Sequence, residues 1–144
     1  DLGRPRLPVD RIFTIAGSGT VVTGTLIDGS LAVGQEVEIV PSGLKSRIRG
    51  LQTHKSKITT ASPGSRVAAN LVGVNTSQLV RGDVVTIPGW LKPTSLVTVN
   101  LKLISYLQRP LPHGAEVSFH TLAAETMAHR VSVRLNFHQQ PIFF

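Results

Sequence analysis

The sequence predicts an all-β protein organised as two tandem antiparallel β-barrels. Its 144 residues contain short runs of Val, Ile, Leu and Thr, and 13 glycines and nine prolines interrupt these runs along the whole length. Runs of this kind, bounded by turn residues, are typical of strands rather than helices. No long amphipathic helical pattern occurs. Apolar residues make up 41% of the chain, which suits a packed core and argues against disorder.

The first predicted element is a hairpin near the N-terminus. Alternate residues from Ile12 to Ala16 share one face of a strand, and Phe13 and Ile15 share the other. Gly17-Ser18-Gly19 then predicts a tight reversal, because glycine adopts positive φ without steric cost. A β-branched run follows the reversal and should form the second strand.

The same glycines could be mistaken for a phosphate-binding loop. Gly19 and Gly24 have the spacing of such a loop, but Thr25 and Leu26 occupy the positions that require Lys and then Ser or Thr. A dinucleotide-binding fingerprint also fails, since Val22 stands where its third glycine belongs. We therefore interpret these glycines as parts of a hairpin and expect no GTP binding by this chain.

Further strands should complete the first module, each bounded by Gly, Pro, Asp or Ser turn signals. The clearest of them are expected at residues 36–40, 45–51, 66–72 and 84–87. Many short strands in succession favour a closed antiparallel barrel. We place this barrel at residues 7–88.

A short linker and a second β-module follow. Two prolines bracket the linker, which we place at residues 89–93. The second module is placed at residues 94–144, with strands expected at 96–103, 116–120 and 128–135. We interpret the stretch between the last two strands as strand and loop rather than as a helical turn. The whole chain is then β-structure.

The composition disfavours several classes of site. The chain has no cysteine, which excludes a disulfide framework and a zinc–thiolate site. Its five histidines are dispersed without metal-ligand spacing, so we expect no metal site. No nucleophile elbow or paired-carboxylate motif is present, and we expect neither enzymatic activity nor a cofactor. Without a signal peptide or an apolar stretch of about 20 residues, the protein should be cytoplasmic and have no membrane partner.

Three segments carry a resemblance to a known family. The segment Val9-Asp10-Arg11-Ile12-Phe13-Thr14-Ile15-Ala16-Gly17-Ser18-Gly19 resembles the opening hairpin of the second domain of elongation factor Tu-class GTPases. Together with Gly64-Ser65-Arg66-Val67-Ala68, its Asp-Arg start is similar to selenocysteine-specific elongation factors. Pro88-Gly89-Trp90-Leu91-Lys92-Pro93 is similar to the joint before the third domain. The resemblance implies an incomplete third-domain barrel at 94–144, and a GTPase domain, with its GTP and Mg, that is absent here.

The resemblance also implies a role for three residues. Asp10, Arg11 and Arg66 match positions that hold the selenocysteinyl group of selenocysteinyl-tRNA in that family. A selenol is largely ionised near neutral pH, whereas serine and cysteine, with a thiol pKa of about 8.5, are not. Two guanidiniums would favour the anion, and Asp10 could fix their orientation. Taken without the resemblance, the spacing of these residues favours a surface ion pair and a solvated strand residue.

A second group of cations is a candidate tRNA surface. Five cations lie within 13 residues that contain no acid, and we call them the basic strip: Lys45, Arg47, Arg49, Lys55 and Lys57. The net charge of +7 favours nucleic acid as a partner. The first three should share one face of a strand, since side chains alternate. They could follow tRNA phosphates or could be the solvated face of a barrel strand, and both interpretations stay open.

The function implied by the resemblance is delivery of selenocysteinyl-tRNA to the ribosome. In the full-length factor this delivery would depend on GTP and on the factor's own GTPase domain, while the present chain would supply the aminoacyl pocket and a tRNA surface. Two alternatives remain. One is a part of another translational GTPase, such as elongation factor Tu or the initiation factor gamma subunit, and the other is a stand-alone basic β-barrel that binds RNA or protein.

Overall fold

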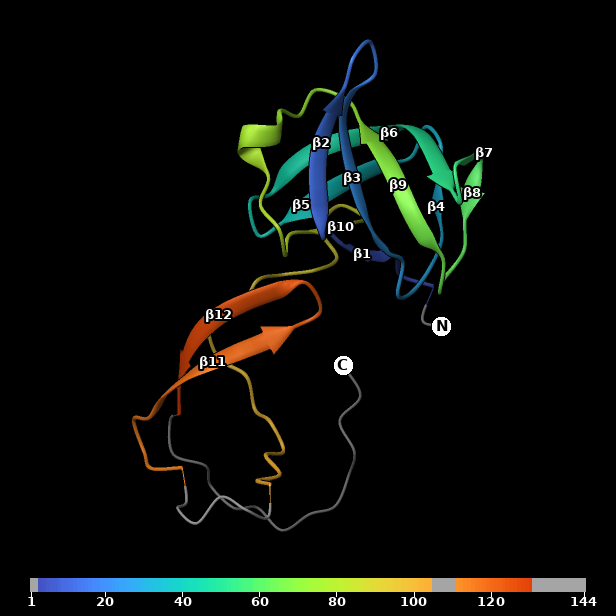
Figure 1. The fold of residues 1–144 in the computed structure, drawn as a ribbon. Helices are drawn as coiled ribbons and strands as arrows, with labels where there is room; N and C mark the ends of the chain where they lie inside the picture. Colours follow the sequence, from blue (N-terminus) through green and yellow to red (C-terminus); the bar gives the residue numbers. More distant parts are fainter. Residues whose placement is uncertain (1–2, 105–110, 131–144) are drawn as a thin grey trace. The chain divides into compact units, whose positions relative to one another are not determined.

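The computed structural model describes residues 3–104 and 111–130 (Figure 1). Within these ranges the one helical element is the short 3-10 helix η1 (Thr76–Gln78), and the other regular elements are strands. The all-β prediction is therefore confirmed. The chain divides into two compact units: residues 1–98 with 120–125, and residues 99–119 with 126–144.

Eight strands of the first unit form one antiparallel sheet. Seven follow the order β1-β10-β5-β6-β9-β3-β2, and the eighth, β7, pairs with β6. Their bounds are β1 (Arg6–Pro8), β2 (Arg11–Ile15), β3 (Gly19–Thr25), β5 (Glu36–Val40), β6 (Leu44–Thr53), β7 (Ser56–Ile58), β9 (Arg66–Leu71) and β10 (Val84–Thr86). A separate small sheet pairs β4 (Leu31–Ala32) with β8 (Thr60–Ala61). The strands expected between residues 36 and 87 are confirmed as β5, β6, β9 and β10.

The predicted N-terminal hairpin is confirmed as β2 and β3. Phe13 lies opposite Val21 in its antiparallel register, and the Ser18 N–H donates to the Ile15 carbonyl at 2.9 Å to close the turn. Gly17 and Gly19 have φ values of 75° and 88°, which other residues adopt only with strain. These glycines therefore form a turn and not a phosphate-binding loop. The sequence indicated this, because the lysine that such a loop requires is absent.

The first sheet is strongly curled, and its two edge strands are almost consecutive in the chain (Figure 1). The Val9 N–H donates to the Asp83 carbonyl beside β10, and the next N–H, of Asp10, donates to the Thr23 carbonyl on β3, both at 2.8 Å. The backbone thus changes its hydrogen-bonding partner from the β10 side to β3 between two adjacent residues. No ladder joins β1 to β2. The closed barrel expected at 7–88 is corrected to a curled, barrel-like sheet whose edges are joined by this bend.

Gly24 permits the bend to lie close to β3. A Cβ atom at this position would lie 2.0 Å from the Pro8 carbonyl oxygen and 3.1 Å from a side-chain methyl of Leu7. Only a residue without a side chain fits such a backbone approach. The second glycine of the apparent phosphate-loop spacing therefore serves packing between β1 and β3.

Apolar side chains of the curled sheet fill its interior. The core comprises Leu7, Val9, Val22, Leu26, Leu31, Val37, Ile39, Ile48, Leu51, Ala61, Val67, Ala69, Leu71, Val74, Leu79 and Val85. In β6 the alternation breaks, because buried Ile48 and Leu51 are three residues apart. The register with β9 shifts between Ile48 and Gly50, which leaves Arg49 as the extra residue of a β-bulge.

The second β-module differs from its prediction. A hairpin of β11 (Glu116–Thr121) and β12 (Ala124–His129) confirms the strand-and-loop interpretation of residues 120–127. The strand expected at 96–103 is wrong: these residues form no strand, and Leu96 is 73% exposed. Apolar alternation does not suffice where the backbone has no ladder partner among the described residues. The expected strand at 128–135 and the remainder of the module extend beyond the described residues, so a second barrel stays a prediction.

Candidate functional site

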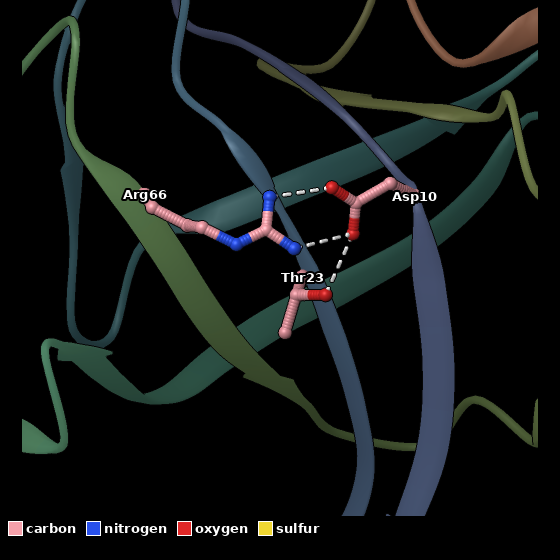
Figure 2. A network of polar contacts seen from close by, with 3 residues as sticks. All are labelled: Asp10, Thr23 and Arg66. Atoms are coloured by element: carbon pink, nitrogen blue, oxygen red, sulfur yellow. Dashed lines mark hydrogen bonds and ion pairs between the residues drawn. The ribbon is translucent and has the colours of Figure 1, made fainter.

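Asp10 and Arg66 meet on the surface of the first sheet. The Nη1 atom of Arg66 donates to Asp10 Oδ2 at 2.6 Å, and Nη2 donates to Oδ1 at 3.0 Å, so the pair is bidentate. Thr23 lies between them and donates its Oγ1 hydrogen to Asp10 Oδ1 at 2.8 Å (Figure 2). We call these three residues the triad. Bidentate, charge-assisted contacts of this kind are stronger and more directional than ordinary surface ion pairs.

Three neighbouring strands bring the triad together. Strand β3 pairs with β2 on one side and with β9 on the other, and Thr23 lies opposite Arg11 and Ala68 in the two registers. Arg66 lies opposite Thr25, two positions further along β3. The bend that follows β1 places Asp10 beside Thr23. Residues 56 positions apart in the chain are thereby brought into contact.

The charges of the triad are mutually stabilised. The hydrogen bond from Arg66 lowers the pKa of the Asp10 carboxyl, partial burial opposes this, and the Thr23 hydroxyl lowers it further. The same pair raises the pKa of Arg66 above its usual value. The side chains of Arg66 and Asp10 are 50% and 27% exposed, so the guanidinium is half open to solvent. A guanidinium has five N–H donors, and two of them engage Asp10.

Arg11 completes the set of three residues predicted for this site. Its side chain is exposed, and its positive charge contributes to the lowered pKa of Asp10. Within the described residues its side chain makes no hydrogen bond or ion pair. With Asp10 negative and Arg11 and Arg66 positive, the site carries a net charge of about +1. The structure therefore brings Asp10 and Arg66 into contact, with the Arg11 charge near enough to act on Asp10.

The members of the basic strip are all exposed, but their environments differ. Lys45 lies opposite Glu38 in the ladder between β5 and β6, and Arg47 forms an exposed 3.7 Å ion pair with Glu36. Acids on the adjacent strand β5 thus reduce the charge at this end. Exposed pairs of this kind contribute little stability.

The other end of the strip has a different character. Arg49 donates from Nη1 to the Ser18 carbonyl at 3.1 Å and so ties β6 to the β2–β3 turn. Lys55 lies in the turn between β6 and β7 with a φ of 67°, and Lys57 lies opposite Gln52 on β7. The sheet therefore separates the strip into an acid-paired part and a part without facing acids.

Two surface hollows lie away from the triad. The larger, of about 510 Å³, lies beside the β2–β3 turn and includes Arg49 and Thr76 in its lining. The second, of about 350 Å³, includes Lys45 and Arg47. Among the residues that the structure describes, no group of three or more His, Asp or Glu side chains could hold a metal ion. None of the helices in the described ranges is long and apolar enough to cross a membrane.

Two threonines of this site were not predicted from the sequence. Thr23 fixes Asp10, and Thr53 at the end of β6 donates from Oγ1 to the Arg66 carbonyl at 2.9 Å. Threonine is frequent in the strands of this protein, so neither residue stands out in the sequence. Only the strand registers show which threonines face the charged pair.

The fold belongs to a known class of domain. Residues 19–86 match the family model described as elongation factor Tu domain 2. This range contains the site-forming strands β3 and β9. Residues 19–86 therefore form a domain of the elongation factor Tu domain 2 type.

Within this class the chain is similar to selenocysteine-specific elongation factors, as the sequence indicated. Such a factor from Desulfomicrobium baculatum is 47% identical over 123 residues, which are 85% of this chain and 19% of that protein. Elongation factor 1-alpha of Pyrobaculum calidifontis is 42% identical over 79 residues, 55% of this chain and 18% of that protein. The chain thus spans about a fifth of the length of these relatives.

Solved structures agree. The apo form of translation elongation factor SelB from Methanococcus maripaludis matches with a TM-score of 0.73 and 29% identity, over 88% of this chain and 27% of that one. A bacterial selenocysteine-specific elongation factor matches with a TM-score of 0.58 and 33% identity, over 60% and 15% of the two chains. The resemblance to selenocysteine-specific elongation factors is therefore confirmed in both sequence and fold.

Proposed function

We propose that this chain is the part of a selenocysteine-specific elongation factor that holds the selenocysteinyl end of its tRNA. In this proposal Asp10, Arg11 and Arg66 surround the selenocysteinyl group. The full-length factor, with its own GTPase domain, delivers the charged tRNA to the ribosome in a GTP-dependent manner in the cytoplasm. The chain itself contributes binding, and GTP and Mg act elsewhere in the factor.

The observation that carries the proposal is the geometry of Arg66. Asp10 engages two of its N–H groups, while the remaining donors lie on a side chain that is half exposed. A selenolate could accept hydrogen bonds from these donors without displacing Asp10. The net charge of about +1 at the site suits a single anion. A neutral serine hydroxyl would gain much less from the same donors, since hydrogen bonds to charged groups are the stronger ones.

The basic strip is proposed to contact the tRNA backbone. Its members lie on β6, on β7 and in the turn between them, and all are exposed. Phosphate contacts of this kind are independent of the amino acid that the tRNA carries. In this proposal Lys55 and Lys57 contribute more than Lys45 and Arg47, which have glutamates opposite them.

Binding of two tRNAs to the full-length factor tests the proposal. Arg66→Ala should weaken binding of selenocysteinyl-tRNA by about 1.5–3 kcal/mol and binding of seryl-tRNA far less. Arg66→Lys keeps the charge but loses the bidentate contact, so it should recover only part of the loss. Equal losses for both tRNAs with Arg66→Ala would show that Arg66 contacts phosphate or supports the fold.

A second candidate function is binding of aminoacyl-tRNA in general. The similarity to elongation factor 1-alpha over 79 residues favours it. A general carrier would bind the two tRNAs with similar affinity before any substitution is made. The wild-type affinity ratio therefore separates the two candidates.

A further inference from the structure

We propose that Thr23 is a positioning residue of the selenocysteinyl site, whose hydroxyl holds Asp10 so that Asp10 in turn presents Arg66 to the anion. This inference rests on the proposed function and assigns a role to a residue that does not itself touch the selenocysteinyl group. Its basis is the order of contacts from Thr23 to Asp10 to Arg66.

Thr23 holds Asp10 at two points. Its backbone carbonyl accepts from the Asp10 N–H at 2.8 Å, and its Oγ1 donates to Asp10 Oδ1 at 2.8 Å. The first contact fixes the backbone of Asp10, and the second fixes the rotation of its carboxylate. Asp10 needs such support because it lies in the bend between β1 and β2, outside either strand.

The fixed carboxylate determines where Arg66 lies. Both Asp10 oxygens bind the guanidinium, and Oδ1 is the oxygen that also accepts from Thr23. A carboxylate held by one hydrogen bond and a planar fork has a single orientation that satisfies all three contacts. Threonine suits this role because its branched Cβ restricts the χ1 rotation that aims the hydroxyl. The unused donors of Arg66 are thus presented in one direction.

A matched residue on the same strand makes no such contact. Thr25 lies two positions along β3, directly opposite Arg66, and is exposed. Within the described residues its hydroxyl makes no hydrogen bond. A role that belonged to any threonine near Arg66 would therefore be shared by Thr25, whereas a role in positioning Asp10 belongs to Thr23 alone.

The test compares variants of the full-length factor by the ratio of their affinities for selenocysteinyl-tRNA and seryl-tRNA. Thr23→Val removes the donor and keeps the shape, and it should reduce this ratio by about 3- to 10-fold, as expected for removal of one hydrogen bond. Thr23→Ser keeps the hydroxyl and should retain most of the ratio. Thr25→Val should leave it unchanged. Thr23→Ala removes the hydroxyl without adding a methyl group, which covers the case in which the valine variant does not fold.

A second readout follows the Asp10 carboxyl by carbon NMR. Loss of the Thr23 hydroxyl should raise the pKa of Asp10 toward its ordinary value, and an unchanged pKa would show that this hydroxyl does not hold the carboxylate. Equal weakening of both tRNAs by Thr23→Val, or no change in the ratio while Arg66→Ala reduces it, would overturn the role of Thr23 alone. No change in the ratio with Arg66→Ala would overturn the proposed function, and this inference with it.

Discussion

Arg66 and Arg47 are both exposed arginines paired with an acid on a neighbouring segment, yet the two pairs differ in construction. Arg66 binds Asp10 through two hydrogen bonds at 2.6 and 3.0 Å, and Thr23 supports the carboxylate. Arg47 approaches Glu36 at 3.7 Å, and both side chains are more than 60% exposed. The first pair has a defined direction, whereas the second is a loose charge contact. Specific recognition of a small anion requires the first kind, and phosphate attraction requires only the second.

The fold explains why the two regions differ. Arg47 and Glu36 face each other across the regular antiparallel ladder between β5 and β6. Asp10 instead lies where the chain changes its pairing from β10 to β3, and Gly24 lets that bend approach closely. The bend places the Asp10 carboxylate beside β3. Regular strand pairing would not bring a side chain to that position.

The largest expected effect comes from filling the space at Gly24. Gly24→Ala would place a Cβ atom 2.0 Å from the Pro8 carbonyl oxygen, so the bend must move. We expect a loss of about 3 kcal/mol or more in the free energy of unfolding, measured by denaturant titration. Gly50→Ala is the matched control, because a Cβ there meets nothing within 4 Å, and it should change stability by less than about 1 kcal/mol. Similar effects of the two variants would show that the close approach does not set the bend.

Double-mutant cycles compare the two ion pairs directly. For Asp10→Ala and Arg66→Ala we expect a coupling free energy of about 1 kcal/mol, since the contact is bidentate and the carboxylate is partly buried. For Glu36→Ala and Arg47→Ala we expect about 0–0.5 kcal/mol. Thermal or chemical unfolding of the single and double variants measures both values. Equal couplings would remove the distinction on which the assignment of Arg66 to an anion site depends.

The pH dependence of the free energy of unfolding should reveal the contact between Asp10 and Arg66. The pKa of Asp10 in the folded protein lies below its ordinary value of 3.8, so its stabilising contribution is complete above about pH 4 and is lost as the pH falls through the folded pKa. The stability difference between wild type and Asp10→Asn should therefore shrink below about pH 4. In an Arg66→Ala background the same comparison should show a weaker pH dependence, because the main cause of the shift is gone. A stability difference between wild type and Asp10→Asn that stays constant from pH 7 to pH 2 would contradict the contact between Asp10 and Arg66.

Some of these features were predictable from the sequence and others were not. The β2–β3 hairpin followed from Gly17 and Gly19, because a local turn needs only local residues. The meeting of Asp10 with Arg66 was indicated by a family resemblance, while the pairing geometry depends on a bend that no periodicity reveals. Residues 96–103 have the same alternation as true strands and form none, since a strand also needs a partner.

The basic strip shows the same limit of prediction. Counting residues along the chain found no acid among its members, yet the ladder places Glu36 and Glu38 opposite its first half. The Arg49 bulge was likewise invisible to an alternation rule that assumes a regular strand. Charges and registers that come from a neighbouring strand are properties of the sheet, and they appear only when the pairing is known.

The smallest expected effect concerns this strip. Lys57→Ala should weaken binding of any tRNA to the full-length factor slightly more than Lys45→Ala, because Lys45 has Glu38 opposite it. Removal of one lysine–phosphate interaction should also reduce the salt slope of the affinity by about 0.7 to 0.9. The measurement is a salt titration with seryl-tRNA, whose neutral hydroxyl keeps the selenolate contact out of the comparison. Indistinguishable slopes for the two variants would show that the facing glutamates do not affect binding.

The central claim, that Arg66 meets the selenolate, is tested most directly by following ionisation of the selenol in the bound state. Selenium NMR of selenocysteinyl-tRNA on the full-length factor would give the pKa of the bound selenol. An adjacent guanidinium stabilises the selenolate. The pKa of the selenol bound to the wild-type factor should therefore lie below the pKa of the selenol in free selenocysteinyl-tRNA. Arg66→Ala should raise it by about one unit or more, and Arg47→Ala should leave it as in the wild type. A bound selenol whose pKa is the same in the wild type and in Arg66→Ala would contradict the account.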